Sequence, residues 1–189
     1  MKITSSEFIR GIVGPNDILE RDIPQICFVG RSNVGKSSLI NALVGKKDLV
    51  KTGKKPGKTT EINFFLINKN KFYFVDLPGY GYARGNKEKI RELILWYLAE
   101  SGVKPYVVVL VLDSKVGLTD FDKDMLDVLR GEKHNYIIIA NKSDKLNQKE
   151  LSEKLKLIKI ESGEENVFPY SAMNKKGTDE LLKKILFGL

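Results

Sequence analysis

A glycine-rich turn at residues 30–38, GRSNVGKSS, has the residue types and the spacing of a phosphate-binding loop. Glycine lets the backbone curl around an anion, and a following helix presents its unpaired N–H groups and positive dipole end to that anion. Lys36 can reach the outer phosphates of a nucleotide, and the Ser37 hydroxyl can bind Mg²⁺. Apolar runs on both sides predict a strand before the turn and a helix after it, a context that a plain glycine turn does not need. We therefore predict nucleotide contacts from Gly30, Arg31, Ser32, Asn33, Val34, Gly35, Lys36 and Ser37.

A second polar loop, DLPG at residues 76–79, ends another apolar run. Asp76 would hold Mg²⁺ through water, and the Gly79 N–H would contact the terminal phosphate with no side chain in the way. A strand-ending Asp followed by Pro-Gly is a common turn, so the motif gains its meaning from the phosphate loop that precedes it. The predicted contacts here are Asp76, Leu77, Pro78 and Gly79.

A third motif, NKSD at residues 141–144, follows the apolar run YIIIA and predicts recognition of guanine. Asp144 can accept hydrogen bonds from N1–H and the 2-amino group of guanine, two donors that adenine lacks. A site built to pair with such donors rejects an analogue without them by roughly 10⁴–10⁵. The motif YSA would offer the Ala172 N–H to guanine O6. The predicted base contacts are Asn141, Lys142, Ser143, Asp144, Tyr170, Ser171 and Ala172.

The elements that carry these loops alternate between apolar β-rich runs and helix-like segments. Strands are predicted at QICFVG, INFFLI, KFYFVDL, YVVVLVLD, YIIIANK and VFP, and helices at 36–44, 87–100, 120–130, 148–161 and 178–187. This alternation predicts an α/β fold with a three-layer, doubly wound, mostly parallel sheet. The run INFFLINKNKFYFVDL instead predicts an antiparallel hairpin at one edge of the sheet. In such folds the site lies at the carboxyl ends of the strands.

Bulk composition narrows the class of protein. The chain has 189 residues, 42% of them hydrophobic and 30% charged, so we expect one globular domain over 1–189. One cysteine and no apolar run of membrane-spanning length predict a cytoplasmic protein without direct membrane insertion. A net charge of +8, with a lysine-rich run at 45–58, has two open interpretations: a polyanionic partner such as RNA, DNA or an anionic membrane face, or a solvated lysine-rich surface.

In this order the motifs resemble those of the translation-factor-related class of small GTPases. The strings KPGKTTEINFF and FVDLPGYGYA more closely resemble the EngB family of bacterial GTP-binding proteins, and the resemblance covers nearly the whole chain. It implies that Thr59 binds Mg²⁺ through its hydroxyl and the γ-phosphate through its N–H. Asn141 stands where that family usually carries Thr, and Asn is usual in GTPases generally. The loop residues that the resemblance adds to the nucleotide site are Gly57, Lys58, Thr59, Thr60 and Glu61, and the expected catalytic residues are Lys36, Thr59 and Gly79.

The resemblance also implies partners and a role. These are GTP and GDP, Mg²⁺, and the large ribosomal subunit or its precursor with its rRNA and ribosomal proteins, in a monomer needed for ribosome assembly and cell division. Tyr80 stands where many GTPases place a water-orienting glutamine, so we expect slow hydrolysis. The alternative is a nucleotide-gated RNA- or protein-binding module, or a septation factor, with incidental hydrolysis. Asn33 has two open interpretations, a ligand for K⁺ or a turn residue that tolerates an unusual backbone angle.

Overall fold

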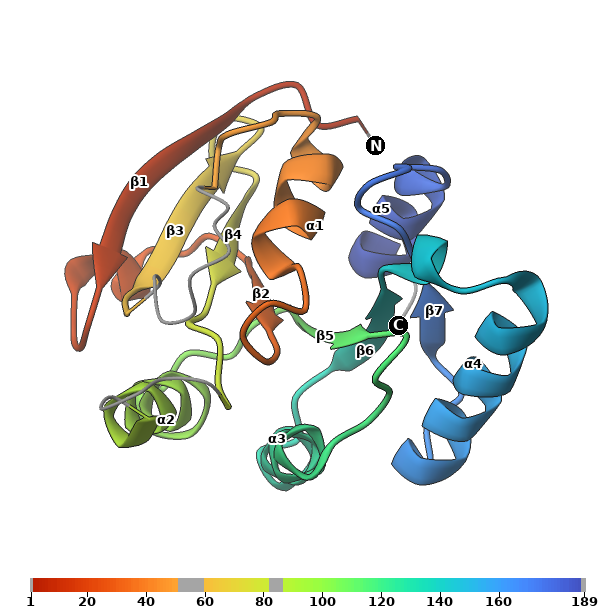
Figure 1. The fold of residues 1–189 in the computed structure, drawn as a ribbon. Helices are drawn as coiled ribbons and strands as arrows, with labels where there is room; N and C mark the ends of the chain where they lie inside the picture. The colour runs from red at the N-terminus through yellow and green to blue at the C-terminus, as the bar shows by residue number, and fades with distance from the viewer. Residues whose placement is uncertain (1, 51–59, 82–86, 188–189) are drawn as a thin grey trace.

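The structure is a computed structural model that describes residues 2–50, 60–81 and 87–187. Within these ranges, seven strands form one sheet in the order β1-β3-β4-β2-β5-β6-β7, and helices cover both of its faces (Figure 1). The strands are β1 (Ser6–Ile12), β2 (Gln25–Val29), β3 (Ile62–Ile67), β4 (Phe72–Asp76), β5 (Val107–Asp113), β6 (Tyr136–Asn141) and β7 (Val167–Pro169). The helices are α1 (Lys36–Val44), α2 (Lys87–Leu95), α3 (Asp120–Gly131), α4 (Gln148–Ser162) and α5 (Thr178–Phe187), with short helical turns η1 (Asp17–Glu20), η2 (Trp96–Glu100) and η3 (Ser143–Lys145).

The central part of the sheet is parallel, as the sequence predicts. Strands β4, β2, β5, β6 and β7 pair in parallel, and β2 is buried along its whole length. Alternate side chains of β5 serve two cores: Val108 and Leu110 pack with α2, α3 and α4, and Val109 and Val111 pack with α1 and α5. A continuously apolar strand is therefore explained by helices on both faces.

The antiparallel edge contains the predicted hairpin and one further strand. Strands β3 and β4 pair antiparallel across the polar turn, where Asn68, Lys69 and Asn70 all have left-handed φ values of 51°, 50° and 71°. Strand β1, which we did not predict, pairs antiparallel with β3 and forms the outer edge. Its run SEFIRGI carries charged residues on a half-exposed strand, so it lacks the apolar signal of the central strands.

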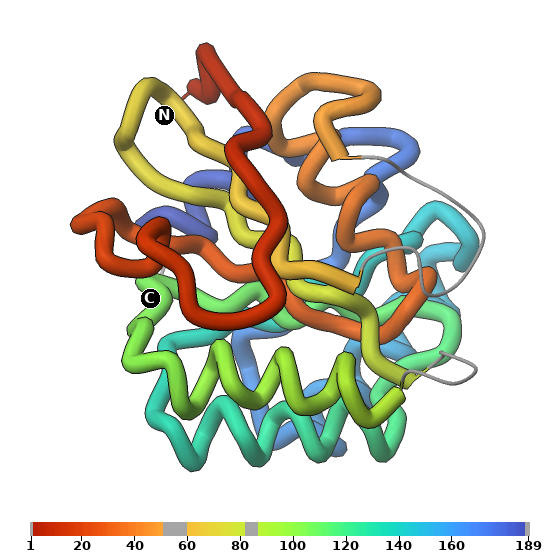
Figure 2. The backbone as a smooth tube through the Cα atoms, turned by 90° about the vertical axis from the view of Figure 1, so that its left-hand side faces the viewer, coloured from red at the N-terminus to blue at the C-terminus, as the bar shows by residue number. Residues whose placement is uncertain are grey.

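The helices begin where the sequence predicts. Helix α3 starts with a capping box, in which Thr119 and Asp122 each bond to the backbone of the other. The segment predicted as one helix over 87–100 is α2 followed directly by the π-helical turn η2. Helices α2 and α3 both lie beneath the sheet (Figure 1, Figure 2), and residues of both line one groove. Among the helices of the described ranges, none is long and apolar enough to cross a membrane.

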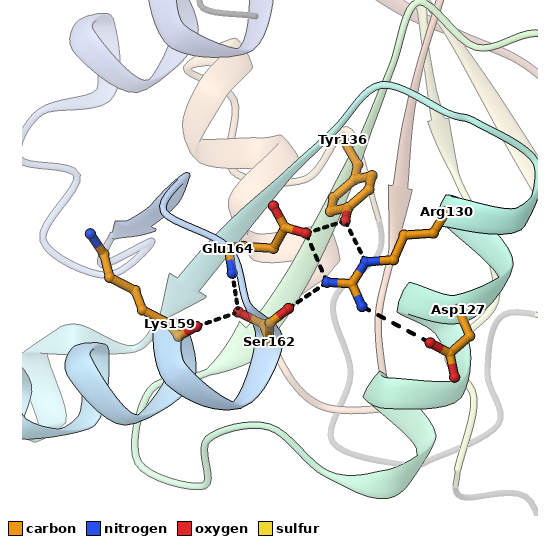
Figure 3. Close-up of polar contacts among 6 residues, drawn as sticks. All are labelled: Asp127, Arg130, Tyr136, Lys159, Ser162 and Glu164. Atoms are coloured by element: carbon orange, nitrogen blue, oxygen red, sulfur yellow. Dashed lines mark hydrogen bonds and ion pairs between the residues drawn. The ribbon is translucent and has the colours of Figure 1, made fainter.

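Arg130 connects three elements of the fold (Figure 3). It lies near the start of β6, whereas the phosphate loop follows the end of the parallel strand β2. Its guanidinium donates to the backbone oxygen of Ser162, to Glu164 Oε1 at 2.8 Å and to the Tyr136 hydroxyl at 3.1 Å. Tyr136 also donates to Glu164. This cluster joins the last turn of α3, the start of β6 and the chain after α4.

Replacing Arg130 with Ala should lower the free energy of unfolding by about 1–2 kcal/mol, because a charged donor to three partners is lost from a half-exposed position. Urea denaturation monitored by circular dichroism measures this loss. The matched control is Lys123→Ala on the same helix, where the pair with Asp120 is long, at 3.9 Å, and exposed. That control should change the free energy by less than about 0.5 kcal/mol. Equal losses in the two variants would contradict a special role for Arg130.

Candidate functional site

The predicted phosphate loop joins β2 to α1 and needs its glycines for close approach. Gly30 and Gly35 have φ values of +154° and +98°. A Cβ on Gly30 would lie 2.3 Å from the backbone oxygen of Val111, and one on Gly35 would lie 2.4 Å from Asn141 Nδ2. Helix α1 begins at Lys36, and no side chain of the described residues caps it, so its first N–H groups can bind an anion.

Lys36 is buried inside this loop. Its Nζ donates to the backbone oxygen of Gly30 at 2.8 Å and to that of Arg31 at 3.3 Å. Burial lowers the pKa of Lys36, while the nearby carboxylates of Asp76 and Asp122 act in the opposite direction. The lysine charge is therefore held among carbonyl groups at the place where the sequence expects phosphates.

Ser37 and Asp76, two of the residues predicted to hold magnesium, meet at the end of β4. The Ser37 hydroxyl lies 3.4 Å from Asp76 Oδ2, and Asp76 Oδ1 is buried with no hydrogen-bond partner among the described residues. Burial raises the pKa of Asp76 from 3.8 to about 6, although Lys36 and Ser37 lower it. An unpartnered, desolvated carboxylate beside a hydroxyl is a donor set that suits a hard divalent cation, so these residues fit Mg²⁺.

The loop after β4 lies directly on the phosphate loop. The Ser32 N–H donates to the backbone oxygen of Tyr80 at 2.9 Å, and the Ser32 hydroxyl donates to that of Gly79 at 3.0 Å. A Cβ on Gly79 would lie 2.8 Å from Ser32 Cα, so only glycine allows this approach. Leu77 is buried beneath the loop. The structure thus brings together the two loops predicted to contact phosphates.

The NKSD loop also contacts the phosphate loop, across more than 100 residues of sequence. Asn141 Nδ2 donates to the backbone oxygen of Val34 at 3.0 Å, and Lys142 Nζ donates to that of Asn33 at 2.5 Å. Lys142 is held in turn by Asp113 Oδ2 at 2.7 Å. Asn33 has a left-handed φ of 66°, the conformation that the turn interpretation of this residue requires. The base motif and the phosphate motif therefore form one connected structure.

Asp144 lies beside the YSA segment. The Ser171 hydroxyl donates to Asp144 Oδ1 at 2.5 Å, and the Ser143 N–H donates to the backbone oxygen of Tyr170 at 3.1 Å. The Ala172 N–H, which the sequence assigned to guanine O6, donates to Asn141 Oδ1 at 3.2 Å. Asp144 itself is exposed. The two segments predicted to contact the base are adjacent in space.

Residues 57–61, which the family resemblance adds to the nucleotide site, lie only partly within the described ranges. Gly57, Lys58 and Thr59 lie outside the described residues, and Thr60 and Glu61 are exposed residues just before β3. The remaining predicted residues gather at the carboxyl ends of β2, β4 and β6 and at the segment after β7.

Two carboxylates of this region were missed by sequence analysis. Asp113 ends β5 and pairs with Lys142, a position that its strand-ending place in YVVVLVLD could have signalled. Asp122 is buried in the first turn of α3 and binds Arg31 and Tyr80. The sequence carried no signal for this role, because Asp122 resembles any acidic residue at the start of a helix.

Asp76→Asn should change how stability depends on pH in protein free of nucleotide and magnesium. Because the pKa of Asp76 is raised to about 6, the folded state binds its proton more tightly than the unfolded chain. The corresponding stability is present below about pH 4 and is lost as the pH rises through about 6, a loss of about 3 kcal/mol. Urea unfolding in EDTA from pH 4 to 7 should show this loss in the wild type and not in the variant. Asp22→Asn, at an exposed loop residue, controls for the removal of one charge; parallel pH curves for wild type and Asp76→Asn would contradict the argument.

Comparison with known proteins places this geometry in a family. A family model described as 50S ribosome-binding GTPase matches residues 25–142. Proteins named probable GTP-binding protein EngB from Clostridium kluyveri and Clostridioides difficile are 45% and 42% identical to this chain. Their alignments cover 97% and 98% of this chain and 95% and 94% of the relatives.

Solved structures share the fold. A crystal structure of a probable GTP-binding protein engB gives a TM-score of 0.71 at 28% identity, over 86% of this chain and 96% of that one. A variant of Aquifex aeolicus Era bound to GDP and AlF4⁻ gives a TM-score of 0.71 at 25% identity, over 86% of this chain and 55% of that one. Because the family model spans more than half of the chain and the relatives align along almost all of it, this chain belongs to the EngB family of GTP-binding proteins, within the 50S ribosome-binding GTPases.

Proposed function

We propose that this EngB-family GTPase binds GTP and GDP with Mg²⁺ at the site described above, and that its nucleotide state controls binding to the large ribosomal subunit or its precursor. Residues 1–189 form one GTPase domain in this proposal. The observation that carries it is the pair of hydrogen bonds from Asn141 and Lys142 to carbonyl groups of the phosphate loop. A site in which the base motif supports the phosphate motif suits one ligand that carries both parts, a guanine nucleotide.

Guanine would be recognised by Asp144, with Lys142 over the base. The Ser171 hydroxyl donates to one oxygen of the Asp144 carboxylate, which orients the group. A carboxylate can accept from N1–H and from the 2-amino group of guanine together, whereas adenine would leave it without a donor. Residues 170–172, at the end of the next strand, lie beside this carboxylate.

The phosphates would lie over the start of α1. Lys36 and the loop N–H groups would neutralise their charge, and the Gly79 N–H would contact the terminal phosphate. Ser37 and, through water, Asp76 would hold Mg²⁺, with Thr59 added on the family resemblance, and the bound cation would supply positive charge beside the phosphates. The buried Asp76 oxygen without a partner supports this assignment.

Hydrolysis should be slow in the isolated protein. Tyr80 follows Gly79, and its hydroxyl donates to Asp122 at 2.8 Å. The side chain is buried, and it carries no carboxamide to orient an attacking water. Single-turnover measurements of GTP cleavage by the isolated protein test this expectation, which a rate of several per second without a partner would contradict.

The ribosomal part of the proposal rests on different support. The matching family is described as 50S ribosome-binding, and a net charge of +8 suits a partner rich in rRNA. A requirement in cell division and a monomeric, cytoplasmic state rest on the family resemblance and composition.

The engagement of Tyr80 with Asp122 favours a second candidate, a nucleotide-gated binding module in which hydrolysis is incidental. Stimulation of hydrolysis by ribosomal precursors would favour the switch over that module.

Asp144→Asn should change the nucleotide preference of the protein from guanine to xanthine, because the new amide can donate to the C2 carbonyl of xanthine. Affinity for GTP should fall by at least about a hundredfold, and affinity for XTP should rise. Competition against a labelled nucleotide measures both. Co-sedimentation with large ribosomal subunits should then follow XTP in the variant and GTP in the wild type.

Asp179→Asn, at an exposed position on α5, is the matched control and should keep its preference for GTP. An unchanged guanine preference in Asp144→Asn would show that Asp144 does not read the base. A switch in nucleotide preference without any nucleotide effect on sedimentation would contradict the ribosomal part alone.

If Asn33 helps to hold K⁺ against the phosphates, replacing K⁺ by Na⁺ at matched ionic strength should slow hydrolysis, because the cation would supply charge during transfer. Asn33→Asp and Asn33→Gly both tolerate the observed φ of 66°. The first keeps a side-chain oxygen and the second removes it, so comparing them separates the side chain from the backbone angle. Equal rates in K⁺ and Na⁺ would leave only the turn interpretation.

A further inference from the structure

We propose that Asp122 is a positioning residue of the phosphate site, which holds Gly79 beside the phosphate loop by binding both Arg31 and Tyr80. In this arrangement the terminal phosphate of GTP meets a Gly79 N–H that is already in place. The inference rests on the proposed function, since it takes Gly79 as the contact to that phosphate.

The carboxylate of Asp122 gathers donors from three separate elements. Tyr80, from the loop after β4, donates its hydroxyl to Oδ1 at 2.8 Å. Arg31, from the phosphate loop, donates Nε to Oδ2 at 3.1 Å. Thr119, from the start of α3, donates its N–H and its hydroxyl to Oδ2 at 3.0 and 2.7 Å. Asp122 is 0% exposed, so these donors take the place of water.

A helix cap alone does not account for this arrangement. The bonds to Thr119 complete the capping box of α3 and would suffice for that purpose. A buried carboxylate is expensive unless its charge is paired and its oxygens accept hydrogen bonds, and here the pairing comes from the two loops of the phosphate site. Burial and the neighbouring Asp122 charge raise the pKa of Tyr80, so its hydroxyl stays protonated and continues to donate.

The position of Gly79 follows from that of Tyr80. Ser32 holds the backbone of Gly79 and Tyr80. Its N–H donates to the backbone oxygen of Tyr80, and its hydroxyl donates to that of Gly79. The side chain of Tyr80 is held by Asp122, which also holds Arg31, the residue before Ser32. The same carboxylate thus fixes both partners of this backbone contact. Without it, Gly79 would be held by the bonds from Ser32, by the bridge between the backbones of Arg31 and Tyr80, and by the packing of the Tyr80 ring.

This role should be visible as a difference between two nucleotides. GDP lacks the phosphate that Gly79 is proposed to contact, so its affinity should not depend on where Gly79 lies. GTP makes that contact, and a displaced Gly79 would first have to return to the phosphate loop. General loosening of the fold would instead weaken the binding of both nucleotides. The ratio of the affinity for the GTP analogue to the affinity for GDP therefore separates positioning from stability.

The experiment measures dissociation constants for GDP and for a GTP analogue with an imido bridge between its β and γ phosphates, by competition against labelled GDP. In Asp122→Asn the analogue should bind about tenfold more weakly relative to GDP, because the new amide nitrogen meets donors instead of accepting from them. Tyr80→Phe keeps the ring and removes only the hydroxyl, so it should fold and should lower the ratio several-fold. Single-turnover hydrolysis should slow in both variants.

Two controls complete the design. Arg130→Ala destabilises the far end of the fold and should leave the affinity ratio unchanged. Gly79→Ala, whose Cβ would press on Ser32, should lower the ratio by itself. A ratio unchanged in Gly79→Ala would contradict the phosphate contact and with it the proposed function. A ratio lowered in Gly79→Ala but unchanged in both Tyr80→Phe and Asp122→Asn would overturn the inference alone.

Discussion

Three charged side chains are buried near the carboxyl ends of β2 and β4, and the site depends on how the surrounding groups satisfy them. Lys36 donates to carbonyl oxygens of its own loop, and Asp122 accepts from three elements. Asp76 keeps one oxygen without a partner in the described part of the chain. Burying a charge costs several kcal/mol unless hydrogen bonds and opposite charge offset it. Lys36 and Asp122 are satisfied within the protein, whereas Asp76 would be stabilised by a cation if one bound beside it.

Much of the site could be predicted because its residues follow a recurring motif, in which glycines stand where the backbone passes close to other groups. Gly30 is needed where the loop passes the Val111 carbonyl, and Gly35 where it passes Asn141. Those positions recur wherever a strand turns into an anion-binding helix, so their spacing is readable in the sequence. The central strands were readable because burial on both faces requires continuous apolar runs. The start of α3 followed from the capping preference of Thr119.

What could not be predicted depends on tertiary neighbours. Asp120, Asp122 and Asp124 look equivalent at the start of α3, and only the packing of α3 against the two loops buries the middle one. Strand β1 carries charged residues because it lies at the edge, and its pairing with β3 is visible only in the assembled sheet. Thr59 was assigned by resemblance, and it lies outside the described residues.

The strand order also has a consequence for synthesis of the chain. Strand β1 is made first, yet its partner in the sheet is β3, with Ser6 opposite Ile67. Strand β2 likewise needs β4 and β5, which both follow it in sequence. As the chain leaves the ribosome, the first two strands must therefore remain unpaired until the middle of the sequence has emerged. The phosphate loop is translated early, but the surroundings that give it shape are completed only when Asn141 is in place.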